Sequence, residues 1–214
     1  AGAMKPEPRR HIIFDFDGPI GDTYLLNWEL VRVLHPEVPE EGYRIRHHLG
    51  NVFADPVVPF TAQTAAMYWR LYNELLTRSH VEAAIAPLRI LSRNFALHVV
   101  SSNCEGAITR ALTEAGIMEA FGHILGKEAD TSKVVKFQRL AESEGFSLSE
   151  EAIFVTDTLG DILEANKVDL PTLAVTFGYH PRDILARGNP AGIVDDWEGV
   201  LQFIERIMPA HAHN

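Results

Sequence analysis

The chain has 214 residues, 46% of them hydrophobic, which is enough for one sizeable core with room for a small inserted domain. It carries 29 Asp and Glu against 19 Lys and Arg, a formal net charge of −10, and has no basic run, which argues against a nucleic-acid partner. A single cysteine, Cys104, excludes an internal disulfide and fits a reducing, cytoplasmic compartment. No apolar stretch is long enough for a transmembrane span or a secretory signal, so no membrane partner is expected.

Short apolar segments alternate with helical patterns along the chain. The segments that predict strands lie at residues 11–14, 95–100, 123–125, 152–156, 172–176 and 192–194. The predicted helices lie at residues 24–34, 42–49, 61–80, 105–115, 132–144, 159–167, 182–186 and 197–207, and a further helix carries Pro87 in its first turn and ends near residue 93. Asp22 and Thr23 offer the N-cap of the first helix. This alternation predicts an α/β fold with a parallel sheet and helices on both faces.

The segment between the first and second strands is too long for a simple crossover. Its helical pattern predicts an inserted α-helical domain that lies over the carboxyl ends of the strands. We expect a core made of residues 10–20 and 87–207, an insert of residues 21–86 and a flexible tail of residues 208–214.

Polar side chains follow three of the predicted strands. Asp15 and Asp17 end the first, Ser101 and Ser102 the second, and Asp157 the third. Ligands bind beyond the carboxyl ends of such strands, so these side chains are expected to share one site. Neighbouring carboxylates need a cation or a shared proton to offset their repulsion, and Mg²⁺ with its preference for oxygen ligands suits them best. The alternative is that Asp15 and Asp17 are only strand-end and turn residues.

Two further residues complete the predicted site. Asp161 lies four residues after Asp157, one helical turn on, so both can face one point. Lys133 stands in the first turn of a helix, where the helix dipole does not favour a lysine, and is the candidate cation for a bound phosphate. We expect Lys127 and Lys136 to be solvated lysines.

The ordered motifs resemble those of the haloacid dehalogenase-like phosphohydrolases. The stretch Asp15-Phe16-Asp17-Gly18-Pro19-Ile20 is similar to the first motif of that family, and Val99-Val100-Ser101-Ser102-Asn103 is similar to the second. Lys133 fits the third motif, and residues 155–161 fit the fourth. The resemblance spans about residues 10–207, and it implies a Rossmann-like core with Asp15 on the central strand and a helical cap of the C1 type.

The resemblance implies the roles of the reacting residues. Asp15 is expected to be the nucleophile that forms an aspartyl-phosphate. Asp17 is expected to protonate the leaving oxygen and then to activate water. Lys133 and Ser101 or Ser102 would bind the phosphoryl oxygens, and Ser101 is favoured because it directly follows the apolar run.

The resemblance also implies a Mg²⁺ site. Its expected ligands are the side chains of Asp15 and Asp157 and the backbone carbonyl of Asp17. Asp161 would hold a metal-bound water or orient Lys133.

The predicted cap holds a polar cluster around Gly50. Arg46, His48 and Asn51 are the candidates that would clamp a second anionic group of the substrate, and a solvated polar loop is the alternative. The neighbouring Arg44 and His47 belong to the same cluster.

Three other features are weighed against simpler interpretations. Cys104 follows the second motif, but an inert thiol is favoured over a nucleophile. Tyr179 stands in a loop after the fourth clear strand and is a candidate to touch substrate. The cap aromatics are expected to form the cap's own core, with one or two lining the substrate cavity; they are Tyr24, Trp28, Tyr68, Trp69 and Tyr72.

We therefore predict a Mg²⁺-dependent phosphatase that acts on a small phosphorylated metabolite, as a monomer or a homodimer. Asp17 favours phosphate-ester chemistry, because the dehalogenase and phosphonatase members of the family lack an Asp at that position. The alternatives are a phosphomutase of the same fold, a non-catalytic module that binds a phospho-ligand, and a receiver-type domain phosphorylated on Asp15. The cap and Asp17 disfavour the last of these.

Overall fold

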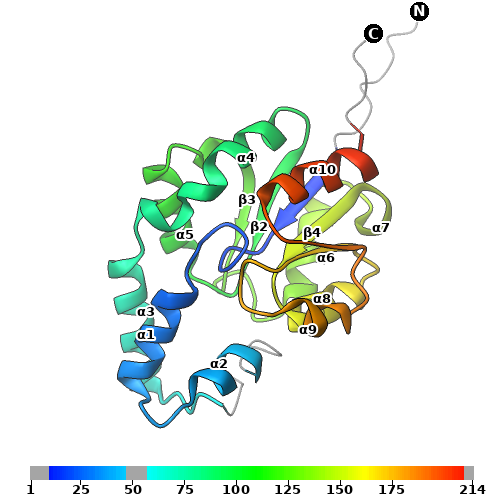
Figure 1. The fold of residues 1–214 in the computed structure, drawn as a ribbon. Coiled ribbons are helices and arrows are strands. Elements are labelled where there is room, and N and C mark those ends of the chain that lie inside the picture. The colour runs from blue at the N-terminus through cyan, green and yellow to red at the C-terminus, as the bar shows by residue number, and fades with distance from the viewer. Residues whose placement is uncertain (1–9, 47–56, 210–214) are drawn as a thin grey trace, which may run out of the picture.

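A six-stranded parallel sheet runs through the computed structural model, which describes residues 10–46 and 57–209. Its strands are β1 (His11–Phe14), β2 (Ala96–Val100), β3 (Phe121–Leu125), β4 (Ala152–Thr156), β5 (Thr172–Val175) and β6 (Gly192–Val194). The order in the sheet is β3-β2-β1-β4-β5-β6, so β1 lies between β2 and β4 near the centre (Figure 1). Sheets of this order bind ligands where the direction of strand addition reverses, which here is between β1 and β4.

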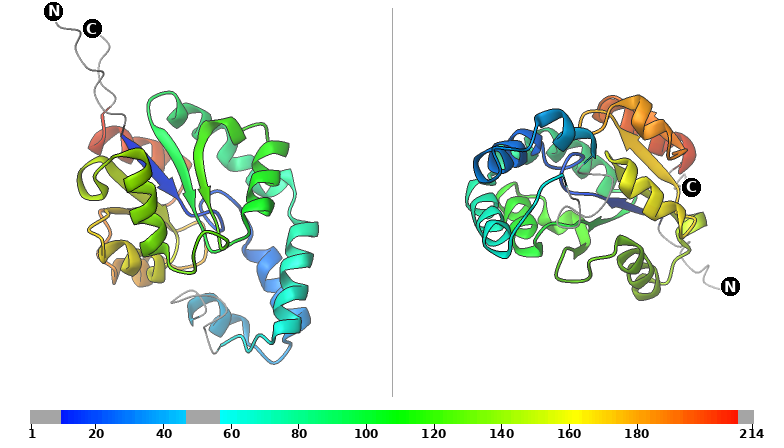
Figure 2. Two further views of the ribbon diagram at one scale, coloured as in Figure 1. Left: turned by 180° about the vertical axis from the view of Figure 1, so that it is seen from behind. Right: turned by 90° about the horizontal axis from the view of Figure 1, so that it is seen from below.

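Helices cover both faces of the sheet (Figure 2). One face packs against α4 (Glu82–Ser92), α5 (Glu105–Glu114) and α10 (Trp197–Ile207). The other face packs against α6 (Lys133–Glu144) and α8 (Leu159–Asn166). The remaining short elements of this part are α7 (Leu148–Glu151), α9 (Arg182–Ala186) and two 3₁₀ turns, η2 (Arg78–Val81) and η3 (Met118–Ala120). The predicted α/β fold with a parallel sheet between two helical layers is confirmed.

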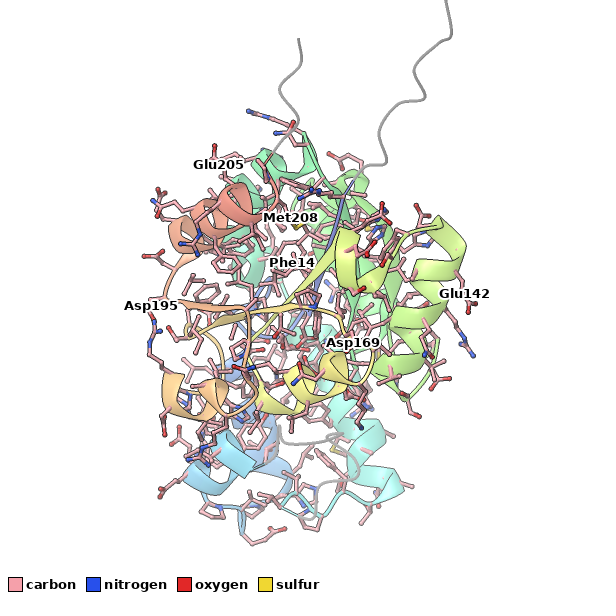
Figure 3. All side chains as sticks on the ribbon, turned by 90° about the vertical axis from the view of Figure 1, so that its right-hand side faces the viewer. Phe14, Glu142, Asp169, Asp195, Glu205 and Met208 are labelled. Carbon is pink, nitrogen blue, oxygen red and sulfur yellow. The ribbon has the colours of Figure 1, made fainter. Side chains whose placement is uncertain are left out.

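Strand β1 shows how the sheet is buried on both sides. Successive side chains point to opposite faces of a strand, so Ile12 and Phe14 join the cluster under α4, α5 and α10, while Ile13 joins the cluster under α6. All three are fully buried, and each contributes about 2 kcal/mol of hydrophobic stabilisation. Figure 3 shows Phe14 in the interior and Glu142 on the outer surface.

A separate group of helices stands beside the carboxyl edge of the sheet (Figure 1). It contains α1 (Tyr24–Leu34), α2 (Glu40–Arg46) and α3 (Ala62–Leu75), all inserted between β1 and α4. Helix α1 packs along α3, and Trp28 and Tyr68 are buried in this group. The inserted helical cap expected from the sequence is therefore present.

Some element boundaries differ from the sequence prediction. Helix α3 ends at Leu75 instead of residue 80, because Leu76 adopts an extended conformation with φ −66° and ψ 123°. Helix α4 begins at Glu82, so Pro87 lies inside the helix and not in its first turn. Pro87 removes the donor to the carbonyl of Ala83, but Ala83 is on the exposed side of the helix, where water can replace that donor.

The sequence placed the boundary between the insert and the second part of the core at residue 87, yet α4 is one continuous helix across that position. The expected tail began at residue 208, but Met208 is buried against the core after α10 ends. Helix α2 begins at Glu40, two residues before its expected start. Among the described residues, no helix has the length and apolarity needed to cross a membrane.

Candidate active site

A cavity of about 70 Å³ lies at the carboxyl edge of the sheet, below the cap helices. Both the core and the cap contribute to its walls, which are polar on the core side and mostly aromatic on the cap side. The lining residues are Asp15, Asp17, Asn27, Tyr68, Trp69, Ser101, Ser102, Asn103, Lys133, Thr158, Asp161 and Tyr179. The predicted strand-end residues therefore meet at one point, apart from Asp157, which lies behind the wall.

Asp15 sits in an ionic network. Its backbone N–H continues the β1–β4 ladder by donating to the carbonyl of Val155 at 3.0 Å, which fixes the residue at the strand end. Lys133 Nζ donates to Asp15 Oδ1 at 3.0 Å and to Asp161 Oδ2 at 2.7 Å, and Thr156 Oγ1 donates to the same Asp161 oxygen at 2.7 Å. The Lys133 ammonium thus bridges the carboxylates of Asp15 and Asp161.

Burial changes the acidity of these groups. It raises the pKa of Asp15 to about 7; Lys133 opposes the rise, and Asp161 and Asp17 add to it. Burial alone would lower the pKa of Lys133, but the charges of Asp15 and Asp161 raise it above its usual range. Lys133 is therefore a fixed cation beside a carboxylate whose charge is only partly compensated.

Asp17 has uncharged partners. Thr23 Oγ1 donates to Asp17 Oδ1 at 2.5 Å, and Tyr72 Oη donates to the same oxygen at 2.6 Å. Asn103 Nδ2 donates to Asp17 Oδ2 at 3.1 Å. Thr23 occupies the N-cap position expected of it, but its side chain makes no capping hydrogen bond to α1. None of these three donors is charged, so Asp17 has no ionic partner among them.

Asp157 is fully buried beneath the cavity, and its Oδ2 accepts a hydrogen bond from the backbone N–H of Tyr179 at 2.7 Å. Gly18 and Gly178 press against this carboxylate: an added Cβ would lie 2.0 Å or 2.1 Å from Oδ2. Gly18 also has φ +101°, which a residue with a side chain rarely adopts. Burial raises the pKa of Asp157 well above its usual range, and Asp15 adds to the rise.

Four residues were predicted for the metal site, with Asp17 contributing its backbone carbonyl and Asp161 acting through a metal-bound water or through Lys133. The side chain of Asp17 is directed to its neutral donors, and that of Asp161 is directed to Lys133. Within the described ranges, no three His, Cys, Asp or Glu side chains are placed to surround a metal ion. Asp15 and Asp157 remain as a pair.

The pair of Asp15 and Asp157 nevertheless fits a hard divalent cation. Asp157 Oδ1 is buried and has no hydrogen-bond partner in the part of the chain that the structure describes. Such an atom is costly unless a ligand satisfies it. Magnesium is commonly held by one or two carboxylates, with water and substrate phosphate as its other ligands.

Ser101 and Ser102 both line the cavity after β2. Ser101 is buried, and its hydroxyl accepts the backbone N–H of Asn103 at 3.1 Å, which leaves the hydroxyl proton available as a donor. Ser102 is partly exposed. Both remain candidates for phosphoryl binding.

The amide of Asn27 links one cap aromatic to the core. Tyr68 Oη donates to Asn27 Oδ1 at 2.6 Å, and Asn27 Nδ2 donates to the hydroxyl of Tyr179. Tyr68 and Trp69 line the cavity, as does Tyr179 from its loop after β5. Sequence reasoning missed Asn27, Asn103 and the contact of Thr23 with Asp17. Among these residues only Asn103 carried a signal, because it ends the stretch that resembles the second motif.

Lys136 was expected to be a solvated lysine, and this expectation is wrong. Its side chain is fully buried, and Nζ donates to the carbonyls of Ser101 at 2.6 Å and Gly126 at 3.2 Å. The cause is helical periodicity, because Lys136 lies on the same face of α6 as the buried Lys133 and Phe137.

Most of the predicted specificity cluster cannot be placed. His48 and Asn51, like His47, lie outside the described residues, and Arg46 ends α2 without a described side chain. Arg44 Nε donates to the backbone carbonyl of Tyr179 at 3.0 Å, which ties α2 to the core.

Burial favours the uncharged form of two neighbouring groups. Burial raises the pKa of the Cys104 thiol, as expected for an inert cysteine. His180 is buried with Nδ1 accepting the backbone N–H of Leu159 at 2.9 Å, and burial lowers the pKa of its imidazole to about 4.

Comparison with known proteins agrees with this geometry. The model of the family "Haloacid dehalogenase-like hydrolase" matches residues 12–175. The chain is 24% identical over 211 residues to a phosphoglycolate phosphatase of Synechococcus elongatus, covering 92% of this chain and 98% of the relative.

Two solved structures show the same fold. A predicted phosphatase from Clostridium acetobutylicum matches with a TM-score of 0.76 at 19% identity, over 92% of this chain and 99% of its own. A β-phosphoglucomutase from Clostridium difficile matches with a TM-score of 0.73 at 17% identity, over 92% of this chain and 96% of its own.

The chain belongs to the haloacid dehalogenase-like hydrolases. Its sequence relatives include proteins named phosphoglycolate phosphatase, so the prediction of a phosphatase of this family is confirmed. Phosphatases of the family generally use a divalent metal ion.

Proposed function

We propose that this protein is a Mg²⁺-dependent phosphohydrolase that cleaves a small phosphate monoester through an aspartyl-phosphate on Asp15. The observation that carries the proposal is the arrangement around Asp15. A buried carboxylate at the end of the central strand faces the cavity, with Lys133 Nζ 3.0 Å from its Oδ1. A nucleophile and a fixed cation at one point are what phosphoryl transfer requires.

The metal would be held by the side chains of Asp15 and Asp157 and by the backbone carbonyl of Asp17. The orphaned Oδ1 of Asp157 supports this assignment. When bound there, the cation would neutralise charge between the carboxylates and the phosphoryl oxygens.

In the first step, an Asp15 oxygen attacks phosphorus and the bond from phosphorus to the ester oxygen breaks. Asp17 gives its proton to the departing oxygen. Lys133 and the hydroxyl of Ser101, with Ser102 beside it, stabilise the charge on the transferred group. Asp17 lines the same cavity as Asp15, which supports this division of roles.

In the second step, Asp17 takes a proton from water as the water oxygen attacks phosphorus. The bond between phosphorus and Asp15 breaks, inorganic phosphate leaves and the Asp15 carboxylate is restored. Asp161 keeps Lys133 in place throughout, because its Oδ2 lies 2.7 Å from the ammonium. The aromatic cap wall excludes bulk water from the cavity.

The substrate is a small phosphorylated metabolite. The cavity of about 70 Å³ favours a small leaving group. Relatives named phosphoglycolate phosphatase make phosphoglycolate the first compound to assay. Arg46, His48 and Asn51 stay candidates for recognising a second anionic group.

The test is phosphate release from a panel of small phosphate monoesters, with and without Mg²⁺, with Asp15→Asn as the control. Release that needs Mg²⁺ and is absent in the variant supports the proposal. Isomerised sugar phosphate with little release would favour the phosphomutase instead. Binding without any turnover would favour the non-catalytic module.

A further inference from the structure

The proposed chemistry does not use Lys136, although it occupies a core position beneath the site. The buried residues of α6 are Lys133, Lys136, Phe137 and Leu140, so Lys136 stands in the stripe that faces the sheet. Its two acceptors, the carbonyls of Ser101 and Gly126, directly follow β2 and β3. The ammonium therefore connects the carboxyl ends of β2 and β3 through hydrogen bonds.

A buried ammonium is costly unless its surroundings offset the charge. In the described part of the chain, both hydrogen-bond partners of Lys136 are neutral carbonyls. Burial lowers the pKa of Lys136 to about 8 and Lys133 adds to this, while Asp15, Asp161 and Glu164 oppose it. At neutral pH the group is still mostly protonated.

The two loops above Lys136 are fastened to each other. Ser101 N–H donates to the carbonyl of Leu125 at 2.9 Å, and Lys127 N–H donates to the carbonyl of Asn103 at 2.8 Å. A Cβ added to Gly126 would lie 2.5 Å from the Asn103 carbonyl oxygen, so the loops touch. A change in how Lys136 holds Ser101 and Gly126 therefore moves the turn at Ser101–Asn103.

We propose that Lys136 is a positioning residue of the phosphoryl subsite. Its ammonium fixes the turn at Ser101–Asn103 so that Ser101 and Ser102 face the phosphoryl oxygens, and it adds positive charge below that turn. The inference rests on the proposed function, since it takes this turn as the phosphoryl-binding element.

The test compares Lys136→Gln and Lys136→Met with the wild type. Glutamine keeps a donor without the charge, and methionine removes both. Lys167→Met is the matched control, because this exposed lysine after α8 loses the same charge far from the turn. The measurements are kcat, KM and competitive inhibition by inorganic phosphate in Mg²⁺ at pH 7, together with thermal melting.

We expect both Lys136 variants to raise the inhibition constant of phosphate by about tenfold, methionine more than glutamine, with a smaller change in kcat. Lys167→Met should match the wild type. A folded Lys136→Gln whose phosphate inhibition stays within about twofold of the wild type would overturn the inference. A wild type with neither turnover nor phosphate inhibition would overturn the proposed function as well.

A measurement on the unaltered protein does not depend on how the variants fold. Lysine Cε resonances followed by NMR across pH identify Lys136 as the side chain that titrates near its pKa of about 8. Four charged groups act on the Lys136 ammonium with and without phosphate: Lys133 on α6, Asp15 after β1, and Asp161 and Glu164 on α8. If the protonated form of Lys136 strengthens phosphate binding, then bound phosphate must favour that protonated form equally. Saturating phosphate should therefore raise the pKa of Lys136. An unchanged titration would contradict the proposal.

Discussion

Asp15 and Asp17 lie two residues apart in the chain, yet they have opposite kinds of neighbour. Asp15 belongs to an ionic network with Lys133 and Asp161, all contributed by the core. Asp17 accepts hydrogen bonds from neutral groups, of which Tyr72 comes from the cap. Both carboxylates line the same cavity.

The difference matches two different tasks. A carboxylate that receives a phosphoryl group must stay charged and fixed while more negative charge approaches, which a permanent cation such as Lys133 favours. A carboxylate that gives and takes a proton needs neighbours that tolerate both of its forms, and the hydroxyls of Thr23 and Tyr72 can rotate to do so. The comparison predicts that each carboxylate responds to different changes.

Removing the charge at Asp15, the proposed nucleophile, should have the largest effect. Asp15→Asn is expected to lower turnover by on the order of 10⁴-fold or more, because the amide cannot form the covalent intermediate. The fold should remain, since asparagine has the same shape. Phosphate release and circular dichroism measure the two effects, and retained activity would remove Asp15 from the role of nucleophile.

The stability of the metal-free protein should fall as pH rises from about 4 to about 7. The pKa of Asp15 is about 7 in the fold against an ordinary value of 3.8, so the folded state binds more protons in this window. The loss is at most about 4 kcal/mol at pH 7.5, and Asp157 acts in the same direction. Mg²⁺ should restore much of the lost stability at pH 7.5, where the carboxylates are charged, and little at pH 5, where Asp15 is mostly protonated.

Urea denaturation in EDTA and in Mg²⁺ at the two pH values measures this effect. Asp15→Asn is the control, and its stability should depend less on pH. A metal-free wild type that gains stability between pH 5 and pH 7.5 relative to this variant would contradict the conclusion that burial raises the pKa of Asp15 and Asp157.

Asp157→Asn should act on the metal and not on the proton donor. We expect the Mg²⁺ concentration for half-maximal activity to rise by about 10-fold to 100-fold. A titration of activity against Mg²⁺ measures it. An unchanged midpoint would take Asp157 out of the metal site.

The smallest effect should come from the cap side of Asp17. Tyr72→Phe removes one donor to Asp17 and is expected to lower kcat by about tenfold with little change in KM. Tyr68→Phe removes the same hydroxyl from the same helix, but that hydroxyl donates to Asn27, so kcat should change by less than about threefold. Equal losses of kcat in the two variants would show that the function of Asp17 does not depend on the hydrogen bond from Tyr72.

The sequence predicted the parts of the site that depend on local structure. Asp15 and Asp157 each follow an apolar strand, and parallel strands bring their carboxyl ends to one edge, so their meeting needed no knowledge of side-chain packing. Lys133 was recognisable from its place at the start of a helix.

The parts that depend on packing between elements were not predicted. Tyr72 was expected among the cap aromatics, but its contact with Asp17 was not. That contact and the one from Asn27 form only because α1 and α3 lie against the carboxyl edge of the sheet, and no local pattern gives that placement. Lys136 differs, because the stripe it shares with Lys133 and Phe137 was visible in the sequence. Its burial was not predicted because lysine side chains are rarely buried.

Gly18 and Gly178 both lie against the Asp157 carboxylate, although the three residues come from separate parts of the chain. The two glycines differ, however, in how a change at position 157 would affect them. At position 178 an added Cβ would lie 2.1 Å from Oδ2 and 2.5 Å from the Cβ of Asp157, so only glycine at position 157 would free space there. At position 18 the φ of +101° would strain any side chain even if residue 157 were shortened. In a library of random variants selected for folding, substitutions at position 178 should appear only together with glycine at position 157 and without activity, whereas substitutions at position 18 should be rare in either background.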